Sequence, residues 1–216
     1  MDKASDNLSG PGPVPLHPGL MILAAGASTR MGRPKQLLPV RGKPLLLHAV
    51  ESALASPVWP VVVVLGAHAE KIRPLLARFP VIVVENAAWS EGMAASIRTG
   101  IAALQQFSRA TDAAIVALCD QPAFSATTIG RLLAAQRVSG RSIVAARYHN
   151  RRGAPALFLR SHFPALASLT GEEGARALLN PPDEAQRETV DTVEMPELGI
   201  DLDTPDDYQA MQAQQQ

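Results

Sequence analysis

Short apolar runs that alternate with amphipathic stretches are the feature that most constrains the fold of this chain. The apolar runs are rich in β-branched residues and carry almost no charge, which is typical of strands covered on both faces, as in a parallel sheet. The intervening stretches have the spacing of helices with one buried face. Alternation of this kind implies βαβ units with right-handed crossovers, and hence an α/β domain of three layers with a mostly parallel central sheet.

The alternation predicts the following element ranges. Strands are expected at 20–24, 61–65, 81–84, 113–118, 142–146 and 156–159, and helices at 45–55, 70–78, 93–106, 127–136, 173–179 and 205–211. No linker or internal repeat interrupts this pattern, so we expect one folded domain over residues 19–211. Residues 1–18, rich in proline and glycine, are expected to form a disordered leader. The glutamine-rich residues 212–216 are expected to fray.

Composition excludes several classes of protein. Nearly half of the 216 residues are apolar, and 20 basic residues balance 20 acidic ones, which removes the electrostatic case for a nucleic-acid binder. The single cysteine, Cys119, precludes a disulfide framework and is expected to be a small buried hydrophobe. No apolar run approaches the roughly 20 residues of a membrane helix, and the N-terminal segment lacks a signal-peptide core. We therefore expect a cytoplasmic protein without membrane contact.

The segment after the first expected strand, Leu23 to Leu38, combines small residues with three cations. Gly26 and Gly32 allow backbone shapes closed to other residues, and exposed backbone N–H groups can cradle an anion. Arg30, Arg33 and Lys35 add positive charge, which suits a triphosphate. The spacing fits neither the Walker A loop nor the dinucleotide fingerprint. The alternative is an ordinary surface loop with incidental charges.

Two acidic centres follow expected strands. Asp120 ends the apolar run 113–118 and is followed by Pro122, although an aspartate here can also serve as a turn or helix cap. Asp201 and Asp203 share a face if their segment is extended. Capping and the helix dipole explain the acidic residues at 206 and 207. Mg²⁺ takes one or two carboxylates together with substrate phosphates, so a pair of distant aspartates meets its needs.

These motifs resemble those of a known family. The string from Leu23 to Leu38 is similar to the L-A-A-G-x-S-x-R-M-G-x-x-K-x-L-L signature of the MobA-like nucleotidyltransferases, and similarity extends over most of residues 20–211. The resemblance implies a Rossmann-like three-layer sandwich of the nucleotide-diphospho-sugar transferase type that uses NTPs and Mg²⁺. It assigns catalytic roles to Arg30, Lys35 and Asp120. It implies metal ligation by Asp120 and Asp201, with Asp203 as the alternative second ligand.

The nucleotide site implied by the resemblance draws on two loops. The segment 85–100 is similar to the family's N-x-x-W-x-x-G-M-x-x-S, which faces the nucleoside; alternatively, Ser90 caps a helix there and Trp89 is a packing anchor. The expected nucleotide-binding residues are Leu23, Ala24, Ala25, Gly26, Ser28, Arg30, Lys35, Asn86, Gly92 and Ser96.

Two further segments resemble the molybdenum cofactor cytidylyltransferase branch of the family. The run 148–159 is similar to R-G-H-P followed by a strand, with Ala154 in place of the histidine. The run 169–176 is similar to G-D-x-G-A-R, with Glu172 in place of the aspartate. The resemblance places Gly153, Pro155 and Glu172 on the acceptor side. Alternatively, Glu172 and Arg176 form an ordinary helix-surface pair.

The expected activity is therefore Mg²⁺-dependent transfer of a nucleoside monophosphate to a phosphorylated acceptor, with release of pyrophosphate. The resemblance favours CTP and molybdenum-loaded molybdopterin, and Ala25, where guanylyltransferase relatives carry glycine, also favours CTP. A molybdoenzyme is a candidate client. The alternatives are transfer to a sugar or polyol phosphate, and a non-catalytic factor for molybdoenzyme maturation.

Overall fold

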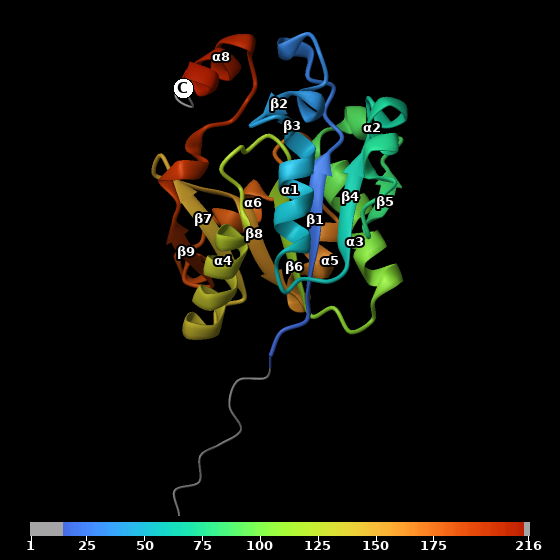
Figure 1. Ribbon diagram of the computed structural model, residues 1–216. Coiled ribbons are helices and arrows are strands. Elements are labelled where there is room, and N and C mark those ends of the chain that lie inside the picture. The colour runs from blue at the N-terminus through green and yellow to red at the C-terminus, as the bar shows by residue number, and fades with distance from the viewer. Residues whose placement is uncertain (1–14, 214–216) are drawn as a thin grey trace, which may run out of the picture.

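The core of the molecule is a sheet with strand order β5-β4-β1-β6-β8-β7-β9, seen in a computed structural model that describes residues 15–213 (Figure 1). Among the described strands of this sheet, only β8 runs against its neighbours; β1, β4, β5 and β6 are mutually parallel, and β7 is parallel to β9. The strands are β1 (Pro18–Ala24), β4 (Val61–Leu65), β5 (Ile82–Glu85), β6 (Ala113–Leu118), β7 (Ile143–Tyr148), β8 (Arg151–Leu159) and β9 (Val190–Glu194).

Helices cover both faces of this sheet. One face packs against α1 (Leu45–Leu54), α2 (Ala69–Leu76) and α4 (Ala126–Ser139). The other packs against α3 (Met93–Phe107), α5 (Phe163–Ala167) and α6 (Arg176–Leu179). Two further helices, α7 (Glu184–Arg187) and α8 (Pro205–Ala213), and a short hairpin of β2 (Pro39–Val40) and β3 (Lys43–Pro44) complete the fold. The prediction of a three-layer α/β domain with a mostly parallel sheet is confirmed.

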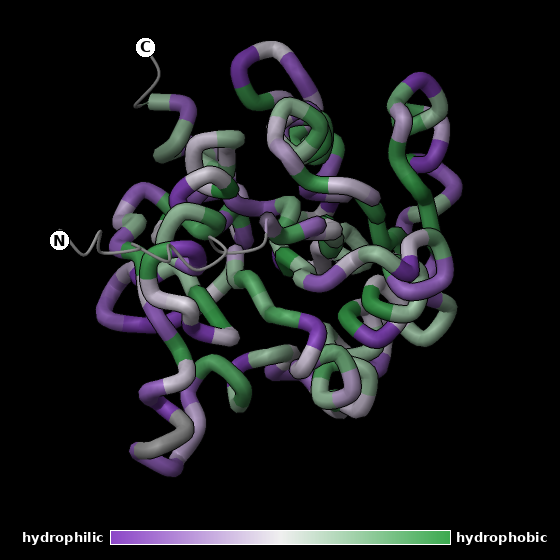
Figure 2. The backbone as a smooth tube through the Cα atoms, turned by 90° about the horizontal axis from the view of Figure 1, so that it is seen from below, coloured by the Kyte–Doolittle hydropathy of each residue, from purple (hydrophilic) through white to green (hydrophobic). Residues whose placement is uncertain are grey.

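The alternation of side chains along each strand explains the two-sided core. Leu20 and Ile22 of β1 face the α1–α2–α4 layer, whereas Met21 and Leu23 face the α3–α5–α6 layer. All residues of β1 are buried, because an interior strand of a three-layer domain meets helices on both faces. Viewed from below, the tube shows hydrophilic loops at the periphery around a largely hydrophobic interior (Figure 2).

Several elements differ from the sequence-based ranges. The hairpin β2–β3, strand β9 and helices α5 and α7 were not expected. The helix expected at 173–179 is reduced to α6, because Gly174 adopts a φ of 58° and packs against Met93 before the helix begins. Thr204 and Asp207 exchange hydrogen bonds at the start of α8, in agreement with the expected capping role.

Both ends of the expected domain require correction. Pro18, assigned to the leader, is buried in β1 and pairs with Ala113 of β6; residues 1–14 of that leader lie outside the described residues. At the other end α8 continues to Ala213, and Gln212 donates to the Tyr208 hydroxyl at 3.0 Å, so residues 212 and 213 belong to the folded domain. Residues 214–216 of the expected tail lie outside the described residues. Within residues 15–213, no helix is long and apolar enough to cross a membrane.

A small separate cluster, here called the α8 cluster, ties the two ends of the domain together. It consists of Met31, Leu38, Val40, Leu45, Leu202, Tyr208 and Met211. The Tyr208 hydroxyl donates to the carbonyl of Pro39 at 2.7 Å, and Figure 1 shows α8 beside the β2–β3 hairpin. The cluster therefore holds the segment 201–203 close to the loop that follows β1.

Candidate active site

The candidate active site lies at the carboxyl ends of β1 and β6, where ligands of parallel α/β sheets bind. A cavity of about 440 Å³ opens there, which we call the nucleotide cavity. Of the predicted residues, it is lined by Leu23, Ala25, Gly26, Arg30, Lys35, Gly92, Ser96 and Asp120. Ala24, Ser28 and Asn86 are not part of the lining, and two of these have structural roles described below.

The loop after β1 is shaped by a buried amide that the sequence analysis missed. The Nε2 of Gln36 donates to the carbonyls of Ala24 at 2.9 Å and Gly26 at 3.0 Å, and the residue is fully buried. Ser28 adopts a φ of 55°, and its hydroxyl accepts from the backbone N–H of Lys35 at 3.1 Å. Ser28 therefore supports the loop instead of lining the cavity. A glutamine directly after Lys35, in an otherwise apolar run, was the available signal.

A cluster of opposite charges crosses the mouth of this cavity. The Lys35 ammonium lies 2.5 Å from Oδ2 of Asp120 and 3.0 Å from Oδ1 of Asp203, and Arg30 lies 2.8 Å from Oδ2 of Asp203. Burial alone would lower the pKa of Lys35, but the charge and hydrogen bonds of Asp120 outweigh it and hold the pKa above its ordinary value. The predicted catalytic residues Arg30, Lys35 and Asp120 are thus brought together.

The two later aspartates occupy different environments. Desolvation, followed by repulsion from Asp120 and Asp203, raises the pKa of Asp201 to about 6. For Asp203 the desolvation is outweighed by Lys35 and Arg30, which hold its pKa below the usual range. Asp203 is therefore neutralised by protein cations, whereas Asp201 faces like charges.

A divalent cation fits this arrangement. Oδ1 of Asp120 is buried and has no hydrogen-bond partner within residues 15–213, which is costly unless another group, such as a cation, meets it. Desolvation and the like charges of Asp120 and Asp203 disfavour the ionised form of Asp201, and a bound cation would offset both effects. Across residues 15–213 no cluster of three or more His, Cys, Asp or Glu side chains is set to hold a metal. Mg²⁺ bound by two carboxylates and substrate phosphates does not require such a cluster.

The loop between β5 and α3, together with the start of α3, forms one wall of the nucleotide cavity. Asn86 is buried; its Nδ2 donates to Oγ of Ser96 at 3.1 Å, and its Oδ1 accepts from the N–H of Ala88 at 3.0 Å. Asn86 therefore fixes Ser96 and the loop without lining the cavity. Gly92, at a φ of 102°, precedes α3, and no side chain caps this helix, so Ser90 lacks the capping role considered above. Ser90 and Trp89 both line the cavity.

A second cavity of about 600 Å³, here called the acceptor cavity, adjoins the first beside the β7–β8 hairpin. Met93 and Leu118 line both cavities. Of the three residues expected on this side, only Gly153 lines it. Pro155 is buried in β8, and Glu172 lines the nucleotide cavity, which corrects its expected place. The Glu172–Arg176 pair does not form, since Arg176 contacts Glu173 instead, at 3.5 Å.

Gln121, directly after Asp120, holds together segments that lie beside the two cavities. The sequence analysis did not identify this residue. It is buried, and its Nε2 lies 3.2 Å from the Tyr148 hydroxyl, 3.1 Å from the Ala154 carbonyl and 3.3 Å from the Leu198 carbonyl. Tyr148 in turn donates to the Ala154 carbonyl. One amide therefore connects the end of β6 to the β7–β8 hairpin and to the segment that leads to Asp201.

Comparison with known proteins shows which family shares this sequence. The family model of the MobA-like NTP transferase domain matches residues 20–190, which include the first loop and Asp120. The chain belongs to the MobA-like NTP transferase family. Members of this family are nucleotidyltransferases that bind nucleoside triphosphates, as the motifs predicted. The match ends before Asp201 and Asp203.

Two relatives that match most of this chain have names that refer to different processes. Nicotine blue oxidoreductase of Paenarthrobacter nicotinovorans is 40% identical over 193 residues, which cover 81% of this chain and 92% of that protein. The purine catabolism protein PucB of Bacillus subtilis strain 168 is 29% identical over 200 residues, which cover 87% of this chain and 92% of that protein. The family therefore includes proteins whose names point to different pathways.

Solved structures of a similar protein support the fold. Rv0371c of Mycobacterium tuberculosis H37Rv superposes with a TM-score of 0.77 at 28% identity, covering 92% of this chain and 98% of that chain. The same protein has been solved in complex with manganese, with a TM-score of 0.71 to this chain. The likeness confirms the expected nucleotide-diphospho-sugar transferase-like fold, and the second structure shows that Rv0371c itself binds manganese.

Proposed function

We propose that this protein is a Mg²⁺-dependent cytidylyltransferase that joins CMP from CTP to molybdenum-loaded molybdopterin and releases pyrophosphate. One observation carries the proposal: Lys35 and Asp120 meet in the nucleotide cavity, where one buried oxygen of Asp120 has no partner among residues 15–213. The acceptor cavity adjoins through Met93 and Leu118 and is lined by Asp201. A cation and a free carboxylate oxygen in one cavity, with a second carboxylate in the adjoining cavity, suit transfer of a phosphoryl group from one ligand to the other.

The chain's own residues position the triphosphate. Lys35, Arg30 and the backbone around Gly26 bind the phosphates, and Lys35 offsets the charge that builds up on pyrophosphate. Asp120 and Asp201 would hold Mg²⁺, which supplies charge neutralisation at the α-phosphate. Asp201 is preferred to Asp203 because both oxygens of Asp203 already accept from Lys35 and Arg30.

The transfer needs no general base. An oxygen of the acceptor's phosphate attacks the α-phosphorus of CTP, the bond from that phosphorus to the bridging oxygen breaks, and pyrophosphate leaves in line. A phosphomonoester has a second pKa of about 6 and is largely ionised near neutral pH. Alignment of the two ligands and neutralisation of charge supply the catalysis.

The lining of the acceptor cavity favours an acceptor that carries a ring and a negative charge over a small sugar phosphate. Its floor is apolar, formed by Val116, Ala156 and Phe158, and its rim carries Arg151 and Arg176. Arg151 makes no ion pair within residues 15–213, and Arg176 makes only the 3.5 Å contact to Glu173. Flat apolar ligand surface fits the floor, and phosphate fits the rim.

The nucleoside end of the other cavity supports a pyrimidine. A Cβ on Gly66 would lie 2.7 Å from the Ala25 carbonyl, 2.8 Å from its Cβ and 2.7 Å from the Cβ of Trp89. Gly66 therefore lies against both Ala25 and Trp89, two residues that line the nucleotide cavity. A glycine in place of Ala25 would leave more room there. A smaller base suits the narrower space.

A second candidate follows from the 40% identical relative, which is named an oxidoreductase. Two further alternatives are transfer to a sugar or polyol phosphate, and a cofactor-binding maturation factor without turnover. The first loop lacks the dinucleotide fingerprint, which disfavours an NAD-dependent reaction.

The test measures pyrophosphate release with Mg²⁺ for CTP, GTP, ATP and UTP, each with molybdenum-loaded molybdopterin or with sugar phosphates. The expected result is that pyrophosphate is released from CTP and not from the other NTPs, and only when molybdenum-loaded molybdopterin is the acceptor. Release with a sugar phosphate would retain the chemistry and replace the acceptor. No release from any pair, together with oxidation of NAD(P)H in the presence of a dye acceptor, would favour the oxidoreductase.

A further inference from the structure

The loop 169–175 covers the start of α3 beside the nucleotide cavity. The carbonyl of Gly171 accepts from the N–H of Ala94 at 3.3 Å. A Cβ on Gly92 would lie 2.8 Å from the Cα of Glu172 and 2.9 Å from its Oε2. The Glu172 side chain is therefore folded over Gly92 and lines the cavity.

This carboxylate has no partner among the residues that the structure describes. Glu172 forms no hydrogen bond or ion pair with any residue between 15 and 213, although its neighbour Glu173 contacts Arg176. Because it can only accept when ionised, its position selects hydrogen-bond donors on a ligand. A phosphate cannot lie against it without repulsion.

The cavity offers two places where an anion could bind, and Glu172 removes one of them. The first is the loop with Arg30 and Lys35. The second is the amino end of α3, a helix of 15 residues whose dipole favours negative charge. Gly171 and Glu172 occupy that end, so the triphosphate is directed to Lys35 and the nucleoside to Glu172.

We propose that Glu172 is a specificity-determining residue: its carboxylate accepts a hydrogen bond from the nucleoside of the bound NTP and fixes the direction in which the nucleotide lies. The donor is either a ribose hydroxyl or the exocyclic amine of cytosine. This inference rests on the proposed nucleotidyltransferase function and deepens it.

The test is calorimetric titration of the full chain with Mg²⁺ and no acceptor. The ligands are CTP, 2′-deoxy-CTP, 3′-deoxy-CTP and UTP, and the proteins are wild type, Glu172→Ala and the matched control Glu173→Ala. Loss of a hydrogen bond to a charged group is expected to raise the Kd of Glu172→Ala for CTP about 10–100-fold. Glu173→Ala should bind CTP like the wild type.

The analogues identify the donor. If a ribose hydroxyl donates, one deoxy analogue binds the wild type more weakly than CTP does but binds Glu172→Ala as CTP does. If the amine donates, UTP shows this coupling instead. Equal or tighter CTP binding by Glu172→Ala, or loss of affinity without coupling to any analogue, would overturn the inference. Wild type that binds no NTP would overturn the proposed function as well, which separates the two failures.

Discussion

The Lys35 ammonium lies 2.5 Å from Oδ2 of Asp120, and both side chains are mostly buried in the wall of the nucleotide cavity. The contact joins a loop that follows β1 to the end of β6, two neighbouring strands of the sheet. Oδ1 of the same aspartate has no partner in the described part of the chain, so the pair presents both a cation and a free acceptor to ligands.

Replacement of Lys35 by alanine is expected to lower kcat/KM for the NTP by about 100-fold or more, because a positioned cation that stabilises developing charge is lost. It also leaves Asp120 and Asp203 without their shared ammonium, so the Tm of the metal-free protein should fall. Steady-state kinetics and thermal unfolding measure both effects. The control is Lys43→Ala, which removes only a surface pair with Glu51. Near-normal kcat/KM in Lys35→Ala would count against its role.

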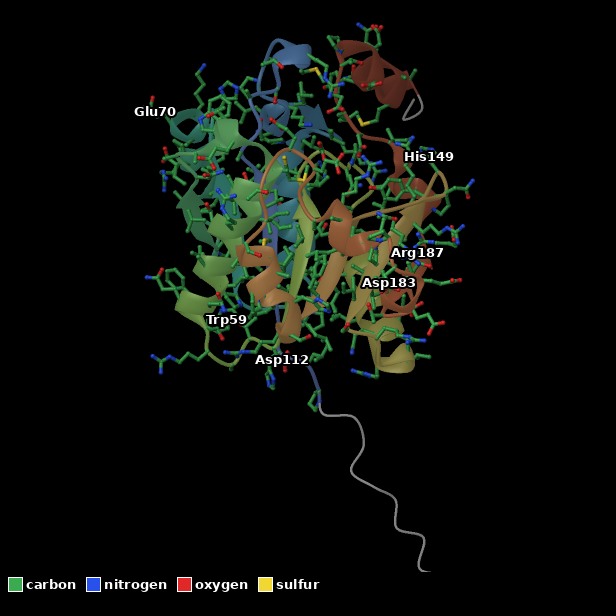
Figure 3. All side chains as sticks on the ribbon, turned by 180° about the vertical axis from the view of Figure 1, so that it is seen from behind. Trp59, Glu70, Asp112, His149, Asp183 and Arg187 are labelled. Carbon is green, nitrogen blue, oxygen red and sulfur yellow. The ribbon has the colours of Figure 1, made fainter. Side chains whose placement is uncertain are left out.

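Asp120→Asn is expected to remove metal-dependent turnover and to weaken Mn²⁺ binding, which electron paramagnetic resonance measures directly. The amide preserves shape but supplies no negative charge for the cation. Asp112→Asn is the matched control: Asp112 contacts His17 at the opposite end of the sheet, near Trp59 (Figure 3). Retained metal binding in Asp120→Asn would remove this residue from the metal site.

The Asp201→Asn variant tests how the negative charge at position 201 affects the stability of the metal-free protein. A carboxyl whose pKa rises from 3.8 to about 6 on folding holds its proton more tightly in the folded state, so the metal-free protein loses stability as pH rises between these values. Asn should therefore raise the metal-free Tm at pH 7.5 by about 1–3 °C, a small gain because solvent screens the charge.

The same variant should show no gain below about pH 4, where Asp201 is protonated in both states. Thermal unfolding in EDTA at both pH values measures this, and Mg²⁺ should then stabilise the wild type more than the variant. A variant less stable than the wild type at pH 7.5 without metal would contradict the assignment.

Gln121→Leu should destabilise the fold by about 1–3 kcal/mol, since buried oxygens of Tyr148, Ala154 and Leu198 lose their shared donor. Mn²⁺ affinity should fall as well, because the segment that leads to Asp201 is no longer held. Denaturant unfolding and Mn²⁺ titration measure the two effects. Gln105→Leu, on the exposed face of α3, is the control. Unchanged Mn²⁺ affinity would limit Gln121 to a structural role.

The sequence predicted the parts of the fold that depend on local pattern. Strands such as β4 and β6 were recovered because buried parallel strands are continuous apolar runs. Strand β9 was missed because only one of its five residues, Val190, is buried, so its pattern resembles a polar loop. Its place depends on pairing with β7, which no local signal reveals.

The site was predicted to a similar extent and for related reasons. Lys35 and Asp120 follow strands and carry charge, so their meeting could be inferred from chain direction alone. Gln36 stands out in the sequence only as a polar residue in an apolar run. Neither Gln36 nor Gln121 reveals its partners, which are mainly backbone carbonyls 10 to 77 positions away. Glu172 was misplaced because the loop, and not a helix, sets its direction over Gly92.

The α8 cluster has a consequence for synthesis of the protein. The pair Arg30–Asp203 joins positions 173 residues apart, and Tyr208 anchors the same region to Pro39. On the ribosome, the parallel strands β1, β4, β5 and β6 can assemble well before residues 201–211 emerge. A nascent chain would therefore have these four strands paired before Asp203 reaches Arg30. The capacity to bind metal should then appear late, when the C-terminal segment has folded onto the domain.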